Sequence, residues 1–257
     1  MLLCIDIGNT NIKLGLFEGE HMRGHWRIAT DRANLADEYA MLLMNLFATQ
    51  GVQFSDINGC AISSVVPALT PIFAELVLNY MRQEALILRQ DTITGMQIKT
   101  DYPEEVGSDL VMNALAARHL YGAPLIVIGF GTATTFVAVS AEGDLEGVAI
   151  APGLATSGDS LFRATATLPQ VALARPDTVI GKNTVRSIQA GFVFGFVGLV
   201  KELVGRFQAE LGGSARVIAT GGLASLIAPE TGVIETIEPD LALIGLRLLY
   251  GLNRPQR

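Results

Sequence analysis

The sequence predicts an α/β protein with two lobes, because two β-hairpins of similar pattern begin the two halves of the chain. Each hairpin consists of an apolar strand, a turn of small residues and a second strand, and the two span 2–17 and 125–139. The 257-residue chain is long enough for two modest domains. We therefore expect a first lobe over 1–121 and a second over 122–257.

The first lobe is predicted to alternate strands and helices. After the hairpin come a helix at 35–49, a strand at 60–66, a helix that begins at 70, a strand at 85–88 and a helix at 109–121. The helix at 35–49 places its apolar residues on one face, and Asn34 is its candidate N-cap. Strand, helix and strand at this spacing form a βαβ unit, so the sheet is expected to be partly parallel.

The second lobe is predicted to repeat this plan. Its hairpin is followed by a loop at 151–160, a long apolar helix at 185–211, a strand at 216–220 that enters a Gly-Gly turn, and a closing helix at 239–252. The turn at 8–10 can be aligned with the turn at 131–133, which indicates an internal duplication. Chance similarity between two hairpins is the alternative.

Composition excludes several classes of protein. A net charge of -7 leaves no basic excess for nucleic acid. Asp6 interrupts the first apolar run, which has no basic segment before it and is therefore not a signal peptide. The longest apolar run, 192–200, is too short to cross a membrane. Cys4 and Cys60 lie in apolar runs typical of buried free thiols. We expect a cytoplasmic protein that binds neither nucleic acid nor membranes.

The three glycine-containing turns predict a nucleotide site. Glycine lets the backbone approach a phosphate, and the turn amides at 8–10 can donate to its oxygens. Asp6, at the end of the preceding strand, can orient Mg²⁺ around that phosphate. The turn at 131–133 would hold phosphates too, and Thr220-Gly221-Gly222 would pack against the nucleoside. Taken singly, each turn also fits an ordinary hairpin or strand end.

Asp109 is the candidate for acid–base chemistry. It falls in the first turn of the helix at 109–121, where the helix dipole favours an ionised carboxylate. Such a carboxylate can accept the proton of an attacking hydroxyl group in phosphoryl transfer. A helix-start aspartate with no catalytic duty is the alternative.

Together these motifs resemble the type III pantothenate kinases. The resemblance covers nearly the whole chain, in the family's order, and its motifs are the D-x-G-N-T opening at Asp6, Val106-Gly107-Ser108-Asp109, Gly131-Thr132-Ala133-Thr134-Thr135, Ile150-Ala151-Pro152-Gly153 and Thr220-Gly221-Gly222. The resemblance implies an actin-like ATPase fold with a ribonuclease-H-like lobe on each side of an ATP cleft. It also implies phosphorylation of the primary hydroxyl of pantothenate by ATP, the first step towards coenzyme A, in a homodimer with sites near the subunit interface.

The resemblance assigns roles residue by residue. The ATP-binding positions would be Asp6, Ile7, Gly8, Asn9, Thr10, Asn11, Ile12, Lys13 and Thr132. The pantothenate-binding positions would be Gly107, Ser108, Asp109, Leu110 and Thr184, with Asp109 as proton acceptor and Thr184 near the dimer interface. The family uses ATP with Mg²⁺ and a monovalent cation, K⁺ or NH₄⁺.

Four charged positions of the family pattern are apolar or lack a side chain in this chain. The family's cation-binding aspartate is Gly129, an arginine is Leu110, an aspartate is Val137 and a glutamate is Ile244. Losing such groups together is physically sensible, because one buried charge without its partner costs more than removing the pair. We therefore expect potassium dependence to be altered or lost.

Because of these four differences from the family pattern, two other functions remain possible. One is a catalytically weakened or inactive relative that binds a ligand or regulates a partner, which Gly129 and Leu110 favour. The other is an actin-like kinase of a different small hydroxylated metabolite, which Leu110 favours by altering the substrate pocket. The retained Asp6 and Asp109 favour the pantothenate kinase.

Overall fold

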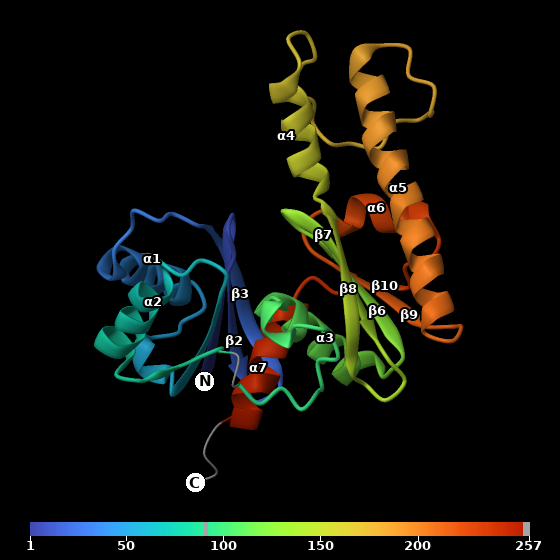
Figure 1. Cartoon of the computed structure of the whole chain (residues 1–257). Helices are drawn as coiled ribbons and strands as arrows, with labels where there is room; N and C mark the ends of the chain where they lie inside the picture. Colours follow the sequence, from blue (N-terminus) through green and yellow to red (C-terminus); the bar gives the residue numbers. More distant parts are fainter. Residues whose placement is uncertain (90–91, 254–257) are drawn as a thin grey trace. The chain divides into compact units, whose positions relative to one another are not determined.

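The fold of the chain is known from a computed structural model that describes residues 1–89 and 92–253 (Figure 1). These residues form two compact units. The first comprises Met1–Gly95, Tyr102–Ala116 and the segment from Leu241 onward. The second comprises Met96–Asp101 and Ala117–Asp240. Each unit holds one five-stranded sheet with helices, as the predicted α/β class requires.

The sheet of the first unit has the strand order β3-β2-β1-β4-β5. Its strands are β1 (Leu2–Ile7), β2 (Asn11–Glu18), β3 (His21–Ala29), β4 (Gly59–Ser64) and β5 (Ala85–Ile87). The first three pair antiparallel as consecutive hairpins, and β4 and β5 run parallel to β1. The predicted hairpin and parallel βαβ unit are confirmed.

The two faces of β1 are buried by different helices. Leu3, Ile5 and Ile7 pack into one core with residues of α1 (Ala36–Ala48) and α2 (Thr70–Leu76). Cys4 lies on the other face, in a cluster with residues of α3 (Ser108–Tyr121) and α7 (Leu241–Asn253). Because side chains alternate along a strand, Asp6 shares the face of Cys4. The fold thus places Asp6 on the face that α3 covers.

The C-terminal helix α7 is part of the first unit, whereas the sequence places it in a lobe that spans 122–257. Leu243 lies against Gly15 of β2, and Tyr250 lies against Gly59 of β4. Gly245 approaches the backbone of Met112 in α3 so closely that a β-carbon there would overlap the carbonyl group of Met112. The apolar face of α7 is therefore buried by the first sheet, which its position in the sequence does not reveal.

The sheet of the second unit has the order β10-β9-β6-β7-β8. Its strands are β6 (Leu125–Phe130), β7 (Ala133–Val139), β8 (Leu145–Pro152), β9 (Arg216–Thr220) and β10 (Thr236–Ile237). Read from β8, this order repeats that of the first sheet, with an antiparallel meander followed by two parallel strands. The shared topology fits the internal duplication that the hairpins indicate.

The helices of the second unit are α4 (Leu154–Ala164), α5 (Thr184–Glu210) and α6 (Ala224–Thr231). The long helix α5 forms as predicted, and Asn183 caps it by accepting a hydrogen bond from the Arg186 amide at 2.9 Å. The predicted loop at 151–160 is wrong, because residues from Leu154 onward are helical. Gly158 and the neighbouring hydroxyl residues mask a helix whose apolar residues, such as Leu161, recur at helical spacing.

Helix α5 is long and apolar enough to cross a membrane by length and composition alone. A single helix of this kind is weak evidence for a membrane protein, because a core helix of a soluble protein can be as long and as apolar. Its side toward the sheet packs Val193, Val200 and Val204 into the core of the second unit. Only 28% of its most apolar 18-residue stretch is buried, so much of the helix presents apolar side chains outward.

Candidate active site

The turn between β1 and β2 is a tight loop that depends on Gly8. The Gly8 amide donates to the Asn11 carbonyl at 3.0 Å, and a β-carbon on Gly8 would lie 2.9 Å from that oxygen. Thr30 braces the turn, since its hydroxyl donates to the Gly8 carbonyl at 2.7 Å and its amide donates to the Thr10 carbonyl at 3.1 Å. Residues 9–11 are exposed, so a ligand can reach the turn.

Two residues of the predicted ATP segment point into the core. Ile7 and Ile12 are fully buried and pair with each other at the base of the hairpin. Their side chains pack into the core and hold the base of the turn in place. The groups that the segment offers are the turn backbone, the side chains at 9–11 and those of Asp6 and Lys13.

Asp6 lies one residue before the end of β1 and is 9% exposed. It pairs with Lys13 of β2 on one side and Ser63 of β4 on the other, so the three side chains emerge on one face of the sheet. Burial raises the pKa of Asp6 to about 6; the charge of Lys13 lowers it and that of Asp109 raises it. Lys13 thus lies opposite Asp6 in the hairpin, and the charge of Asp109 acts on Asp6, so the two carboxylates and the Lys13 ammonium group interact electrostatically.

Asp109 is the second residue of α3. Burial raises its pKa above the usual range, although hydrogen bonds from its own amide and that of Leu110, together with the Lys13 charge, act in the opposite direction. A β-carbon on Gly107 would lie 2.6 Å from the Asp109 carboxylate, so glycine leaves room for this carboxylate to turn back over the helix start. The carboxylate is thus partly desolvated and held by backbone donors.

Ser63 belongs to this cluster, although the sequence motifs do not single it out. It is fully buried, and its hydroxyl lies 3.0 Å from the Ser108 hydroxyl at the start of α3. The observation that identifies Ser63 is its pairing with Asp6 in the parallel register of β1 and β4. By contrast, Leu110, a predicted substrate residue, is only 6% exposed and gives the first turn of α3 an apolar anchor.

In the second hairpin, the position equivalent to Asp6 is occupied by a glycine, Gly129. Gly129 lies one residue before the end of β6 and pairs with Thr135 and Thr220, as Asp6 pairs with Lys13 and Ser63. A β-carbon on Gly129 would lie 2.6 Å from the Thr135 hydroxyl, which occupies the space above it. The position that corresponds to Asp6 in the second sheet therefore carries no carboxylate.

Thr132 is exposed in the second turn. Its carbonyl accepts hydrogen bonds from the Gly153 amide at 3.1 Å and the Thr156 hydroxyl at 2.8 Å. Gly153 is needed here, because a β-carbon would overlap the carbonyl groups of Gly131 and Thr132. The second turn is therefore fixed by the start of α4 and presents the Thr132 side chain outward.

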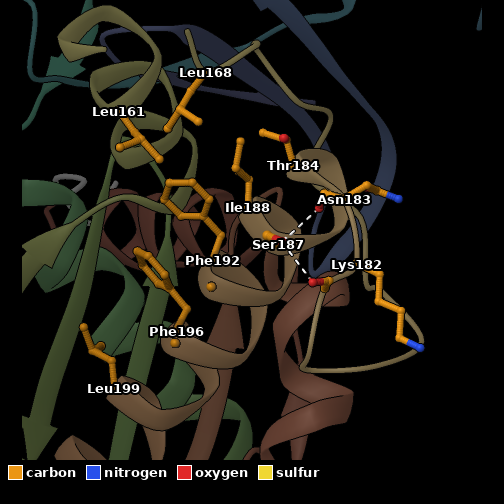
Figure 2. A pocket seen from close by; sticks show the side chains of 13 residues that line it. Leu161, Leu168, Lys182, Asn183, Thr184, Ser187, Ile188, Phe192, Phe196 and Leu199 are labelled. Carbon is orange, nitrogen blue, oxygen red and sulfur yellow. Dashed lines mark hydrogen bonds between the residues drawn. The ribbon is translucent and has the colours of Figure 1, made fainter. Parts of the chain in front are cut away.

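Thr184 lines a pocket of about 850 Å³ along the outer side of α5 (Figure 2). Lys182, Asn183 and Thr184 lie at the beginning of the helix. Phe192 and Phe196 follow along it, and Leu161 of α4 faces them. Thr132 does not line this pocket, so the structure of the second unit keeps these two predicted contacts apart.

The residues of the first unit collect most of the predicted chemistry. Asp6, Lys13, Gly107, Ser108 and Asp109 come together from two strands and one helix start. Among the described residues, no group of three or more His, Cys, Asp and Glu side chains could hold a metal ion by itself. A metal here would need further oxygen ligands from a bound substrate.

Comparison with known proteins identifies the family. A sequence profile described as Type III pantothenate kinase matches residues 2–206. The type III pantothenate kinase of Roseiflexus sp. (strain RS-1) is 54% identical over 254 residues, which cover 99% of this chain and 100% of that protein. That of Moorella thermoacetica (strain ATCC 39073 / JCM 9320) is 48% identical over 253 residues, or 98% of this chain and 100% of that protein.

Solved structures with low sequence identity share the fold. A protein provisionally described as a 2-dehydro-3-deoxygalactonokinase from Sinorhizobium meliloti has a TM-score of 0.62 at 15% identity, covering 100% of this chain and 98% of its own. The activator of 2-hydroxyisocaproyl-CoA dehydratase from Clostridium difficile, with bound ADPNP, has a TM-score of 0.55 at 13% identity over 98% and 94% of the two chains. The predicted actin-like class with ribonuclease-H-like sheets is confirmed, and the full-length matches show that the chain belongs to the type III pantothenate kinase family.

Proposed function

We propose that this protein transfers the γ-phosphoryl group of ATP to the primary hydroxyl of pantothenate, giving ADP and 4′-phosphopantothenate, the first step of coenzyme A synthesis. The observation that carries the proposal is the cluster of Asp6, Lys13 and Asp109 beside the Gly8 turn. The kinases that match the whole chain at 46–54% identity support the same activity. We also propose a cytoplasmic location.

Asp109 is the proton acceptor in this mechanism. The hydroxyl oxygen of pantothenate forms a bond to the γ-phosphorus while the bond from that phosphorus to the bridging oxygen of ADP breaks. The hydroxyl proton passes to the Asp109 carboxylate. A raised pKa makes this carboxylate a stronger base, and its fixed place at the start of α3 gives the short approach that proton transfer needs.

The turn at 8–11 and Lys13 hold the phosphates. Exposed turn amides and side chains donate to phosphate oxygens, while the Lys13 charge attracts them. Gly107 and Ser108 position pantothenate next to Asp109. Thr132 is the proposed contact for ATP, and Thr184 is the proposed contact for pantothenate. These roles are those that the resemblance implies for these positions, all of which lie within the range 2–206 that the family profile matches.

The Asp6 carboxylate is suited to binding a magnesium ion. Its buried carboxylate feels the repulsion of Asp109, and a bound cation would relieve that repulsion and favour the ionised form. When bound with ATP, Mg²⁺ neutralises charge on the transferred phosphoryl group. Asp6 would hold it from the protein side, and phosphate oxygens and water would complete its ligands.

The residues around position 129 do not fit a monovalent cation held in the family's manner. Gly129 supplies no side-chain oxygen, and the hydroxyl of Thr135 occupies the space above it. Neutral hydroxyls bind K⁺ far less strongly than a carboxylate does. Turnover is therefore expected to be independent of K⁺ and NH₄⁺, and no step of the mechanism passes through such an ion.

The protein is proposed to act as a homodimer that joins through α5. Residues 187–200 carry no charge, and Gly191, Gly195 and Gly198 are exposed, with open space where side chains would stand. Small residues on an apolar helix let a second helix approach closely, and a second copy of the same apolar face is the matching surface. Lys182 and Thr184 lie at the rim of this face, which fits a pantothenate site near the interface.

A kinase of another small hydroxylated metabolite is the second candidate, and buried Leu110 in place of the family's arginine favours it. A panel of hydroxylated metabolites tested for substrate-dependent ADP release separates the two. We expect pantothenate to give the highest kcat/KM, without any requirement for K⁺. A different acceptor that is clearly preferred would replace pantothenate as substrate, and ADP release by no acceptor would indicate a non-catalytic relative.

A further inference from the structure

We infer that Ser63 is a positioning residue for this reaction: its hydrogen bond with Ser108 fixes the start of α3, and with it Asp109, against the end of β1. The inference rests on the proposed function, in which Asp109 accepts the proton. It gives a role to a residue to which the sequence analysis assigned none.

The burial of Ser63 requires an explanation. The four residues before it in β4 are small or apolar, and the strand is buried as far as Ser63 itself, which is fully buried. A buried hydroxyl destabilises the fold unless it is hydrogen-bonded, so alanine would suit the packing of this site as well. The partner that the Ser63 hydroxyl has is the Ser108 hydroxyl, 3.0 Å away.

The position of this hydrogen bond links two chemical groups. Asp6 and Ser63 pair directly across β1 and β4, so their side chains stand next to each other on one face. Ser108 is the first residue of α3, and Asp109 follows it. The hydrogen bond therefore connects the strand pair that carries the predicted Mg²⁺ ligand to the helix start that carries the predicted base.

A base must lie within hydrogen-bond reach of the proton it accepts, so a small shift of the helix start is expected to slow the chemical step. Burial of Leu110 anchors the apolar side of the first turn of α3, but its contact is non-directional. The hydroxyl pair supplies a directional contact on the polar side. Loss of either hydroxyl should thus lower kcat more than it raises the KM for ATP.

Ser64 provides a matched control. It follows Ser63 in β4, but its hydroxyl serves the local turn, donating to the Val66 carbonyl at 3.0 Å and accepting from the Val66 amide at 3.1 Å. Ser64→Ala removes a hydroxyl from the same strand end without touching Ser108. A conservative rescue is Ser108→Thr, which keeps the hydroxyl at a partly exposed position.

The test is steady-state kinetics on Ser63→Ala, Ser108→Ala, the double variant, Ser64→Ala and Ser108→Thr, with Tm measured for each. We expect Ser63→Ala to lower kcat about tenfold with the KM for ATP within about twofold, and the double variant to match Ser108→Ala, because the Ser63 hydroxyl acts only through Ser108. Ser108→Thr should restore kcat. Multiplying effects in the double variant, or an equal loss in Ser64→Ala, would overturn the inference.

Failure of the proposed function is recognised separately. If Asp109→Asn retains the wild-type rate, or if the wild type does not turn over, the proposed function fails. The hydrogen bond itself is then tested by hydrogen exchange of the amides at 109–111, which we expect to be faster in Ser63→Ala and Ser108→Ala than in Ser64→Ala. Equal exchange in all three variants would show that the bond does not hold the start of α3.

Discussion

Asp6 and Gly129 occupy equivalent places in the two sheets. Each lies one residue before the end of the central strand, and each pairs with an antiparallel neighbour on one side and a parallel neighbour on the other. One place holds a buried carboxylate next to Lys13, and the other holds a glycine covered by the Thr135 hydroxyl. Of these two equivalent positions, only the one in the first sheet carries a negative charge.

The carboxylate at position 6 should destabilise the unliganded protein at neutral pH. The pKa of Asp6 is raised from 3.8 to about 6 in the fold, so the protonated form is favoured. The stability that protonation provides is complete below about pH 4 and is lost as the pH rises through about 6. Asp6→Asn should therefore be more stable than the wild type by about 2 kcal/mol at pH 7.5.

The measurement is urea denaturation of both proteins without ATP or Mg²⁺ at pH 7.5 and pH 4.5. The difference in the free energy of unfolding should shrink at the lower pH. A difference that stays constant or grows as the pH falls would contradict the raised pKa.

Kinase activity should decline on the acidic side of neutrality. Asp6 must be ionised to hold Mg²⁺ and Asp109 must be ionised to accept a proton, and burial raises both pKa values. The pH profile of kcat/KM should show an acid limb near pH 6. Ionised aspartates of ordinary pKa would keep the rate flat down to about pH 4, and such a profile would contradict this prediction.

A carboxylate introduced at position 129 should fit only if the Thr135 hydroxyl is removed. Gly129→Asp would bring its β-carbon against the Thr135 hydroxyl, so we expect it alone to lower stability by about 1 kcal/mol or more. Gly129→Asp with Thr135→Ala removes this overlap and should make turnover respond to K⁺. The ratio of rates with and without K⁺ is the measurement, and Thr135→Ala alone is the control. A wild type that already requires K⁺ would refute the interpretation of Gly129.

The Gly8 turn should not accept a side chain. In Gly8→Ala the new methyl group would meet the Asn11 carbonyl, which belongs to the backbone and cannot rotate away. The turn must then open, and we expect the KM for ATP to rise about tenfold or more. Gly147→Ala in β8 is the control, because a β-carbon there has open space. Unchanged ATP kinetics in Gly8→Ala would show that the turn does not hold the nucleotide.

The apolar face of α5 should set the oligomeric state. Gly195→Leu places a bulky side chain in the face that lines the pocket and should convert the proposed homodimer to a monomer. Gly205→Leu on the same helix is the matched control, since it is exposed but lies outside the pocket lining. Light scattering after size exclusion distinguishes the two states. A monomeric wild type, or dissociation by both variants alike, would contradict this role of α5.

The sequence predicts the elements that rest on local pattern. Apolar strands around small turns define both hairpins, and a hairpin with a short turn brings Asp6 opposite Lys13. A carboxylate in the first turn of a predicted helix points to Asp109 in the same way. These features follow from neighbouring residues, so no tertiary information is needed.

Other features depend on tertiary structure and could not be predicted from the sequence. The role of Ser63 appears only once the parallel register sets it opposite Asp6 and packing brings Ser108 to it. The burial of α7 on the first sheet depends on which sheet its apolar face meets. Helix α4 was hidden by Gly158, which lowers helix propensity without preventing a helix that packs against its neighbours.

The measurement that bears most directly on the central proposal is mass-spectrometric detection of 4′-phosphopantothenate formed from ATP, Mg²⁺ and pantothenate, with wild type and Asp109→Asn compared in the absence of K⁺. We predict product with the wild type and a rate reduced at least about a hundredfold in the variant, which loses its proton acceptor. No product from a folded wild type in any monovalent salt, or equal rates in the two proteins, would contradict the account.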